Sequence, residues 1–228
     1  MLMARLYEVL TFDCYGTLID WEHGIGEAFA RAAASRGREV DRQRVLALYA
    51  EVEPQVQGEA YRPYREVLAE AAVRVAARLG WTLERGEAGF LADSLPGWPP
   101  FPDTAPALQR LARAGYRLGI LSNVDDDLLA GTLRHLPVRF DLLVTAQQVR
   151  AYKPQPAHFE AARRWVGGRP WLHVAQSAFH DVAPARRLGI PVVWVNRKGE
   201  PLPAGTAPPE REVRTLTELA DWLTGEGG

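Results

Sequence analysis

The chain has 228 residues, of which 47% are hydrophobic and 24% charged, a composition typical of a folded globular protein rather than a disordered or collagen-like chain. Its 27 Lys and Arg residues nearly balance 28 Asp and Glu residues, so we expect no nucleic acid partner. No stretch reaches the roughly 18 apolar residues of a membrane-spanning helix, so we expect no membrane partner. The single cysteine, Cys14, cannot form an internal disulfide, and we predict a cytoplasmic protein.

Short apolar runs rich in β-branched and aromatic residues predict buried parallel strands. In chain order these runs are 7–12, 118–121, 140–144, 171–175 and 191–195. Amphipathic helical patterns lie between or after them, at 103–114 with Asp103 as the expected N-cap, at 181–188, and from Thr215 onward. This alternation predicts the α/β class, with a doubly wound, Rossmann-like parallel sheet.

The strand pattern is interrupted between about residue 25 and residue 95. The apolar residues there have the spacing of one face of a long helix: Tyr64, Val67, Leu68, Ala71, Val75 and Leu79. A proline-rich segment around Trp98 then leads back into the strand and helix alternation. We therefore predict a core formed by residues 1–20 and 98–228, with a helical cap, residues 21–97, inserted after the first strand.

Polar and reactive residues follow four of the predicted strands. They are Asp13, Tyr15 and Thr17 after the first, Ser122 and Asn123 after the second, Lys153 after the third, and Ser177, His180 and Asp181 after the fourth. Each alone has an ordinary explanation as a turn former, a helix cap or a solvated side chain. In an open α/β sheet, however, ligands bind beyond the carboxyl ends of the strands. Their joint occurrence at those ends predicts one shared site.

The same segments resemble, in order, the four motifs of the haloacid dehalogenase superfamily of hydrolases. The matching segments are 12–18, 121–123, 152–154 and 176–181. The resemblance spans the whole chain and includes a helical cap between the first and second motifs. It implies an enzyme in which Asp13 is the nucleophile and forms an ester with the substrate, which water then hydrolyses.

Tyr15 separates two possible activities within this superfamily. Phosphatases that resemble the chain carry a second Asp there to protonate the leaving group, whereas a phenol with a pKa near 10 is a poor acid at neutral pH. A halide leaves without a proton, and type II haloacid dehalogenases are similar to the chain in having Asp-x-Tyr-Gly-Thr. The resemblance therefore implies a hydrolase of small 2-halo carboxylic acids or related small carboxylates, with no cofactor. The alternative is a phosphate monoester hydrolase with Mg²⁺ at Asp13 and Asp181, although neutral Gln176 would deprive the metal of a ligand.

The resemblance also implies a role for each site residue. Lys153 would keep Asp13 ionised, and Asp181, together with His180, would position or deprotonate the hydrolytic water. The substrate-binding residues that it implies are Tyr15, Thr17, Ser122, Asn123 and Ser177.

A dehalogenase that resembles this chain would need a cap arginine to hold the departing halide. Arg44 is the candidate, with Arg42 beside it, but both are chosen from position alone. Gln176 and Ala178 stand where dehalogenases carry Ser and Asn, so another small carboxylate or a strained ring stays open as the substrate.

A third hypothesis is a binding module on a degenerate hydrolase fold. We rank it last, because Asp13, Lys153 and Asp181 are all present. We expect a small-molecule substrate as the partner, and the apolar faces of the predicted cap helices would also allow a homodimer.

Overall fold

The computed structural model describes residues 6–225, so residues 1–5 and 226–228 of the predicted core lie outside the described part. A single sheet has the strand order β3-β2-β1-β4-β5-β6, and every pairing is parallel. Its strands are β1 (Val9–Phe12), β2 (Arg117–Ser122), β3 (Leu142–Thr145), β4 (Trp171–Ala175), β5 (Val192–Val195) and β6 (Arg211–Val213). The predicted doubly wound parallel sheet is confirmed. The strand order reverses at β1, which makes the end of β1 and β4 the expected place for a ligand.

One strand, β6, was not expected from the sequence. It has only three residues, and two of them, Arg211 and Glu212, are charged and exposed. It pairs with β5 at the edge of the sheet. Short, charged strands are common at such edges, where they lack the apolar run by which buried strands are found.

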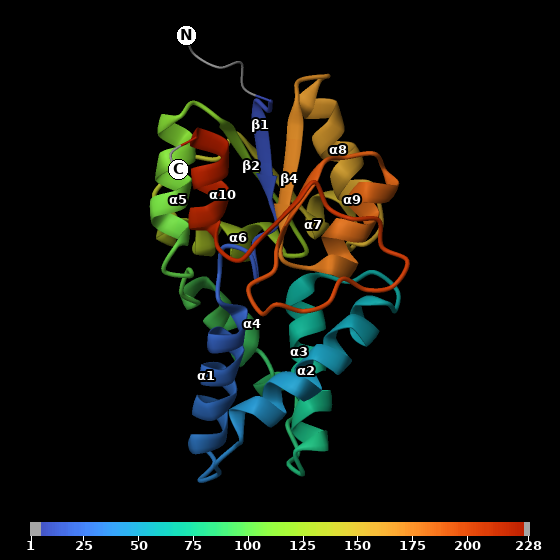
Figure 1. Cartoon of the computed structure of the whole chain (residues 1–228). Helices are drawn as coiled ribbons and strands as arrows, with labels where there is room; N and C mark the ends of the chain where they lie inside the picture. Colours follow the sequence, from blue (N-terminus) through green and yellow to red (C-terminus); the bar gives the residue numbers. More distant parts are fainter. Residues whose placement is uncertain (1–5, 226–228) are drawn as a thin grey trace.

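Helices cover both faces of the sheet (Figure 1). On one side lie α5 (Thr104–Arg113) and α10 (Leu216–Thr224), which pack together; on the other lie α8 (Ala157–Val166) and α9 (Ala183–Arg187). Two adjacent side chains of β1 belong to separate buried clusters. Leu10 shares one cluster with Leu108 of α5, and Val9 shares the other with Phe159 of α8. Successive strand side chains point to opposite faces, so β1 is buried from both sides.

The remaining core elements are short. They are α6 (Asp126–Thr132), η3 (Leu133–His135), α7 (Ala146–Val149) and the π-helical turn η4 (Ala178–Val182). The helix predicted at 181–188 therefore begins earlier, as η4 followed by α9. Asp103 does precede α5, but its carboxylate makes no capping bond to that helix. Instead it accepts hydrogen bonds from Arg197 Nη1 at 2.9 Å and from the Leu216 backbone N–H at 2.7 Å.

The segment between β1 and α5 is helical, and in Figure 1 it lies below the carboxyl ends of the strands. It contains α1 (Trp21–Ala34), α2 (Arg42–Gln57), α3 (Tyr64–Arg78), η1 (Arg85–Glu87), α4 (Phe90–Ser94) and η2 (Leu95–Gly97). We call α1 to α4 the cap helices. The long helix predicted over 64–79 is confirmed as α3, whereas the division into core and cap at residues 20 and 98 stays a prediction.

A buried carboxylate of the core fixes the start of α3. Asp125 follows β2, and its two carboxylate oxygens accept the backbone N–H groups of Tyr64 and Arg65, each at 2.9 Å. The first N–H groups of a helix have no partner within the helix, so this contact satisfies two of them. It also ties the cap helices to the loop after β2, close in the chain to Ser122 and Asn123.

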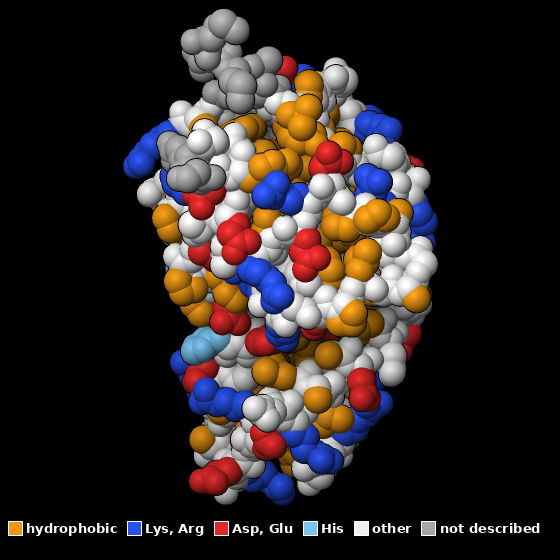
Figure 2. Space-filling view, in the orientation of Figure 1, with side chains coloured by type: hydrophobic (Ala, Val, Ile, Leu, Met, Phe, Trp, Pro, Cys, Tyr) orange, Lys and Arg blue, Asp and Glu red, His pale blue; other side chains and the backbone are white. Residues whose placement is uncertain are grey.

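Within residues 6–225, no helix combines the length and apolar character needed to span a bilayer. On the face shown in Figure 2, Lys and Arg side chains are interspersed with Asp and Glu, without an extended patch of one sign. That face offers no basic surface for a polyanion.

Candidate active site

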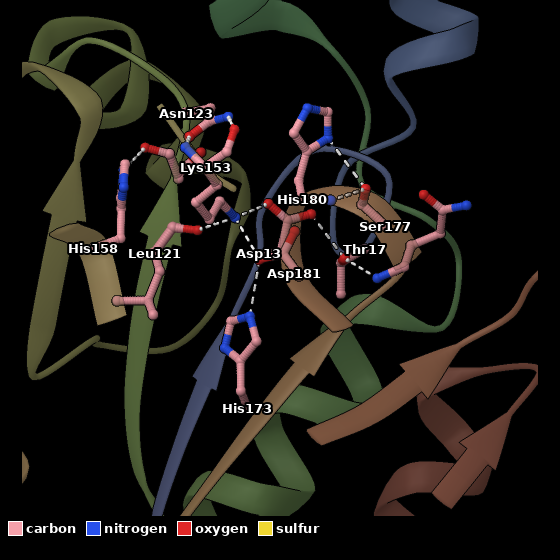
Figure 3. Close-up of polar contacts among 12 residues, drawn as sticks. Asp13, Thr17, Leu121, Asn123, Lys153, His158, His173, Ser177, His180 and Asp181 are labelled. Atoms are coloured by element: carbon pink, nitrogen blue, oxygen red, sulfur yellow. Dashed lines mark hydrogen bonds and ion pairs between the residues drawn. The ribbon is translucent and has the colours of Figure 1, made fainter. Parts of the chain in front are cut away.

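Lys153 lies between two carboxylates at the carboxyl ends of β1 and β4 (Figure 3). Its Nζ donates to Asp13 Oδ1 at 2.9 Å, to Asp181 Oδ1 at 2.6 Å and to the Leu121 carbonyl at 2.9 Å. These bonds use all three N–H donors of the ammonium group. The Lys153 side chain is only 1% exposed, so the structure brings the three predicted residues into one buried ionic cluster.

Burial and mutual charge set the protonation of this cluster. Burial opposes the charge of Lys153, but Asp13 and Asp181 outweigh it and raise the pKa of the ammonium group. For Asp181, burial is likewise outweighed by Lys153 and His173, which lower the pKa of that carboxyl. At Asp13 burial prevails against Lys153, so its pKa is raised. Asp13 is also the more accessible carboxylate of the pair, at 7% exposed against 0% for Asp181, which favours it as the nucleophile.

Thr17 fixes the second oxygen of Asp13. Its hydroxyl donates to Asp13 Oδ2 at 2.9 Å and accepts the Gln176 backbone N–H at 2.9 Å. The turn from Asp13 to Thr17 requires Gly16, whose φ of 96° is strained for residues with a side chain. The turn after β1 therefore orients the carboxylate and joins it to the end of β4.

Asn123 lines the cavity, as expected for a residue at the end of β2, and its side-chain amide also bonds to neighbouring residues. Its Oδ1 accepts the Lys153 backbone N–H at 2.7 Å, and its Nδ2 donates to the Lys153 carbonyl at 3.1 Å and to Gln57 Oε1 of α2 at 3.3 Å. These bonds join Asn123 to the Lys153 backbone and to the cap helix α2, and its predicted role in substrate binding stays a prediction. Ser122 Oγ, in contrast, is buried, lines the cavity and has no hydrogen-bond partner among the described residues, which leaves it free for a substrate oxygen.

The turn after β4 places His180 and Ser177 in the cavity wall. Ser177 Oγ accepts the His180 backbone N–H at 3.0 Å and lies 3.1 Å from His180 Nδ1. Ser177, and not Asp181, therefore caps this turn. Burial lowers the pKa of His180, so its imidazole is neutral at pH 7.

A cavity of about 250 Å³ separates this cluster from the cap helices. Such a volume lies at the small end of ligand sites. Tyr15 forms part of its wall, with its hydroxyl 2.9 Å from Thr132 Oγ1 and its ring edge-on to Trp98. The cap side of the cavity comes from the C-terminal half of α2 and the start of α1 and α3.

The structure does not bring Arg44 to the site. Arg44 is exposed in the first turn of α2, where its backbone N–H is bound by the Asp41 cap, and Arg42 pairs with Glu27 at 2.6 Å. The cavity meets the opposite end of that helix, near Gln57. Position in the sequence could not show which turns of α2 approach the sheet.

Two site residues were missed because they sit in apolar patterns. His173, in the predicted apolar strand 171–175, is fully buried, with Nε2 2.9 Å from Asp181 Oδ1 and Nδ1 2.9 Å from Thr11 Oγ1. Glu53 of α2 lines the cavity and is 9% exposed. The signal in each case was a single polar residue at an inward position of an otherwise apolar face.

We expect His173→Leu to lower the free energy of unfolding by about 1–3 kcal/mol, because Asp181 and Thr11 would lose a buried hydrogen-bond partner. Urea unfolding of the variant measures this loss. His23→Leu, in exposed surroundings on α1, is the matched control and should unfold like the wild type. An unchanged midpoint for His173→Leu would contradict a structural role for the imidazole.

Fold and site together define an α/β enzyme with a buried aspartate, lysine and aspartate cluster beneath a helical cap. A model of the haloacid dehalogenase-like hydrolases matches residues 7–189, and the chain belongs to this family. The resemblance noted in the sequence is thereby confirmed, and the hypothesis of a non-enzymatic binding module is wrong.

Individual relatives match along most of the chain. The (S)-2-haloacid dehalogenase H-109 of Pseudomonas putida is 30% identical over 220 residues, which cover 95% of this chain and 97% of that protein. The haloacetate dehalogenase H-2 of Moraxella sp. (strain B) is 30% identical over 198 residues, or 84% and 87% of the two chains. The crystal structure of the L-2-haloacid dehalogenase RSc1362 superposes with a TM-score of 0.83 at 24% identity, covering 96% of this chain and 99% of that one.

Proposed function

We propose that the protein hydrolyses the bond between carbon and a leaving group in a small 2-substituted carboxylate, such as a 2-halo acid, through an ester at Asp13. The observation that carries this proposal is the position of Lys153 between Asp13 and Asp181 at the floor of a small cavity. The substrates named for the Pseudomonas and Moraxella relatives support the substrate class.

In the first step an oxygen of Asp13 attacks the substrate carbon. The new C–O bond forms as the bond to the leaving group breaks, and the electron pair departs with the halide. No proton is needed, which suits Tyr15, because burial raises the pKa of its phenol well above the usual range. Ser122 Oγ, which has no hydrogen-bond partner among the described residues, would donate to the substrate carboxylate near Asp13.

In the second step water attacks the ester carbonyl of Asp13. The C–O bond from that carbonyl carbon to the substrate oxygen breaks, the 2-hydroxy acid leaves, and Asp13 is regenerated as a carboxylate. His180 is neutral and lines the cavity, so it can accept the proton of the water, while Asp181 holds Lys153 in place.

The magnesium-dependent alternative is supported less well by these residues. Oδ1 of both Asp13 and Asp181 is already bound to Lys153, and neutral Gln176 follows β4 where a third acid would serve a metal. Among residues 6–225, no group of three or more His, Cys, Asp and Glu side chains is arranged to hold a metal ion. These residues therefore do not fit a bound magnesium ion.

Halide and phosphate release from matched substrates test the proposal. We expect chloride release from (S)-2-chloropropionate or chloroacetate, with the same rate in excess chelator and in added Mg²⁺. The (R)-enantiomer and simple phosphate esters serve as comparisons. Phosphate release that requires Mg²⁺, with no chloride release from any 2-halo acid, would favour the alternative.

A further inference from the structure

Glu53 places a carboxyl group in the cap side of the cavity, opposite the Asp13 cluster. It lies in the C-terminal half of α2. The Tyr64 hydroxyl donates to Glu53 Oε1 at 3.1 Å, and Gln57 Nε2 donates to the same oxygen. Because both donors contact Oε1, that oxygen acts as a hydrogen-bond acceptor and the Glu53 side chain is held in place. Among the described residues, neither carboxylate oxygen has a cationic partner.

The charge of the cavity makes this carboxyl unusual. Lys153 is the one Lys or Arg residue in the cavity wall of the described chain, and its three donors are committed to Asp13, Asp181 and a carbonyl. The wall therefore carries net negative charge even before Glu53 is counted. A substrate with a halide or carboxylate on the cap side would meet an acid and no free cation.

Aromatic rings surround the same part of the cavity. Trp21 of α1 and Tyr49 of α2 both line it, with their ring centroids 5.9 Å apart, and Trp98 and Tyr64 line it as well. A carboxylate beside aromatic faces is a favourable environment for a cationic nitrogen, which gains an ion pair and a cation–π contact.

We propose that Glu53, with Trp21 and Tyr49, forms a subsite for a protonated amine, so that the preferred substrate is a small amino-substituted carboxylate. The inference rests on the proposed function for the reacting centre, but the subsite itself can be tested without turnover. The carboxylate of the substrate would lie toward Ser122, and its ammonium group toward the cap. Burial raises the pKa of Glu53 to about 7, and a bound cation would favour the ionised form.

Calorimetric binding of two product-like acids with equal numbers of heavy atoms tests the subsite. They are 3-amino-2-hydroxypropanoate and 2-hydroxybutanoate, which differ by an ammonium in place of a methyl group. At about pH 8, where Glu53 is ionised, the wild type should bind the amino acid about tenfold more tightly. Glu53→Gln should remove most of this preference and leave the affinity for 2-hydroxybutanoate unchanged.

A matched variant on the same helix controls for indirect effects. Glu51→Gln removes an exposed carboxylate that pairs with Arg78 and does not line the cavity, so both affinities should stay at wild-type values. Unfolding midpoints establish that both variants are folded. The proposal would be overturned if the wild type does not bind the amino compound, or if Glu53→Gln prefers that compound as strongly as the wild type does.

Halide release separates this inference from the proposed function. An amine preference that depends on Glu53, in a protein that forms no ester and releases no halide, would support the subsite and contradict the hydrolytic mechanism. Chloride release from 2-chlorobutanoate, with 3-amino-2-hydroxypropanoate bound no more tightly than 2-hydroxybutanoate, would support the hydrolytic mechanism and contradict the subsite.

Discussion

Asp13→Asn is expected to lower kcat/KM for halide release by at least about 10⁴-fold while the protein stays folded. An amide is a poor nucleophile, so the ester at position 13 would not form. Lys153 would keep its bonds to Asp181 and the Leu121 carbonyl, and Thr17 could still contact the new side chain. Halide release measured alongside urea unfolding separates lost chemistry from lost structure.

A control for this variant lies on the surface. Asp127→Asn removes an exposed carboxylate that pairs with Arg65, and it should leave turnover unchanged. The mass of the Asp13→Asn protein must be checked, because deamidation would restore the aspartate. Turnover at more than about a hundredth of the wild-type rate, in protein of the correct mass, would contradict a nucleophilic Asp13.

Lys153→Met should affect both stability and activity. It leaves Asp13 and Asp181 buried without their common cation, and breaking such a buried pair costs about 3–5 kcal/mol in the free energy of unfolding. Activity should fall with it, since the ammonium group stabilises the ionised nucleophile. Urea unfolding and halide release measure the two effects.

The pH dependence of that variant gives a further check. Without Lys153, burial and mutual repulsion raise the pKa values of Asp13 and Asp181 in the folded state above those in the unfolded chain. Stability is then greatest at low pH and is lost as the pH rises, so lowering the pH toward about 5 should recover part of the loss. Lys198→Met removes an exposed lysine that pairs with Glu22, and it should show neither effect. A Lys153→Met protein as stable as this control would be inconsistent with the ionic cluster.

The sheet and the residues at the floor of the site could be predicted from the sequence for one physical reason. Apolar runs separated by amphipathic helices predict parallel strands, and the carboxyl ends of parallel strands meet at one edge. Asp13, Lys153 and Asp181 follow different strands, so their convergence could be inferred without coordinates. The short, charged β6 gave no comparable signal.

The cap side of the site could not be predicted in the same way. A helical pattern shows which face of α2 is buried but not which of its turns approaches the sheet, so Arg44 was selected and Glu53 overlooked. Asn123 shows a related limit. Its type and position suggested a substrate ligand, and it does line the cavity, but the sequence could not show that its amide also bonds to the Lys153 backbone and to Gln57, 66 residues away. Such long-range pairing depends on how cap and core meet.

A single turnover in water enriched in heavy oxygen tests the ester at Asp13 most directly. With enzyme in excess over a 2-halo acid, the first 2-hydroxy acid released should carry ordinary oxygen taken from the Asp13 carboxylate. The peptide containing Asp13 should gain the heavy isotope, because water attacks the ester carbonyl. Heavy oxygen in the first product, with Asp13 unlabelled, would mean that water attacks the substrate directly.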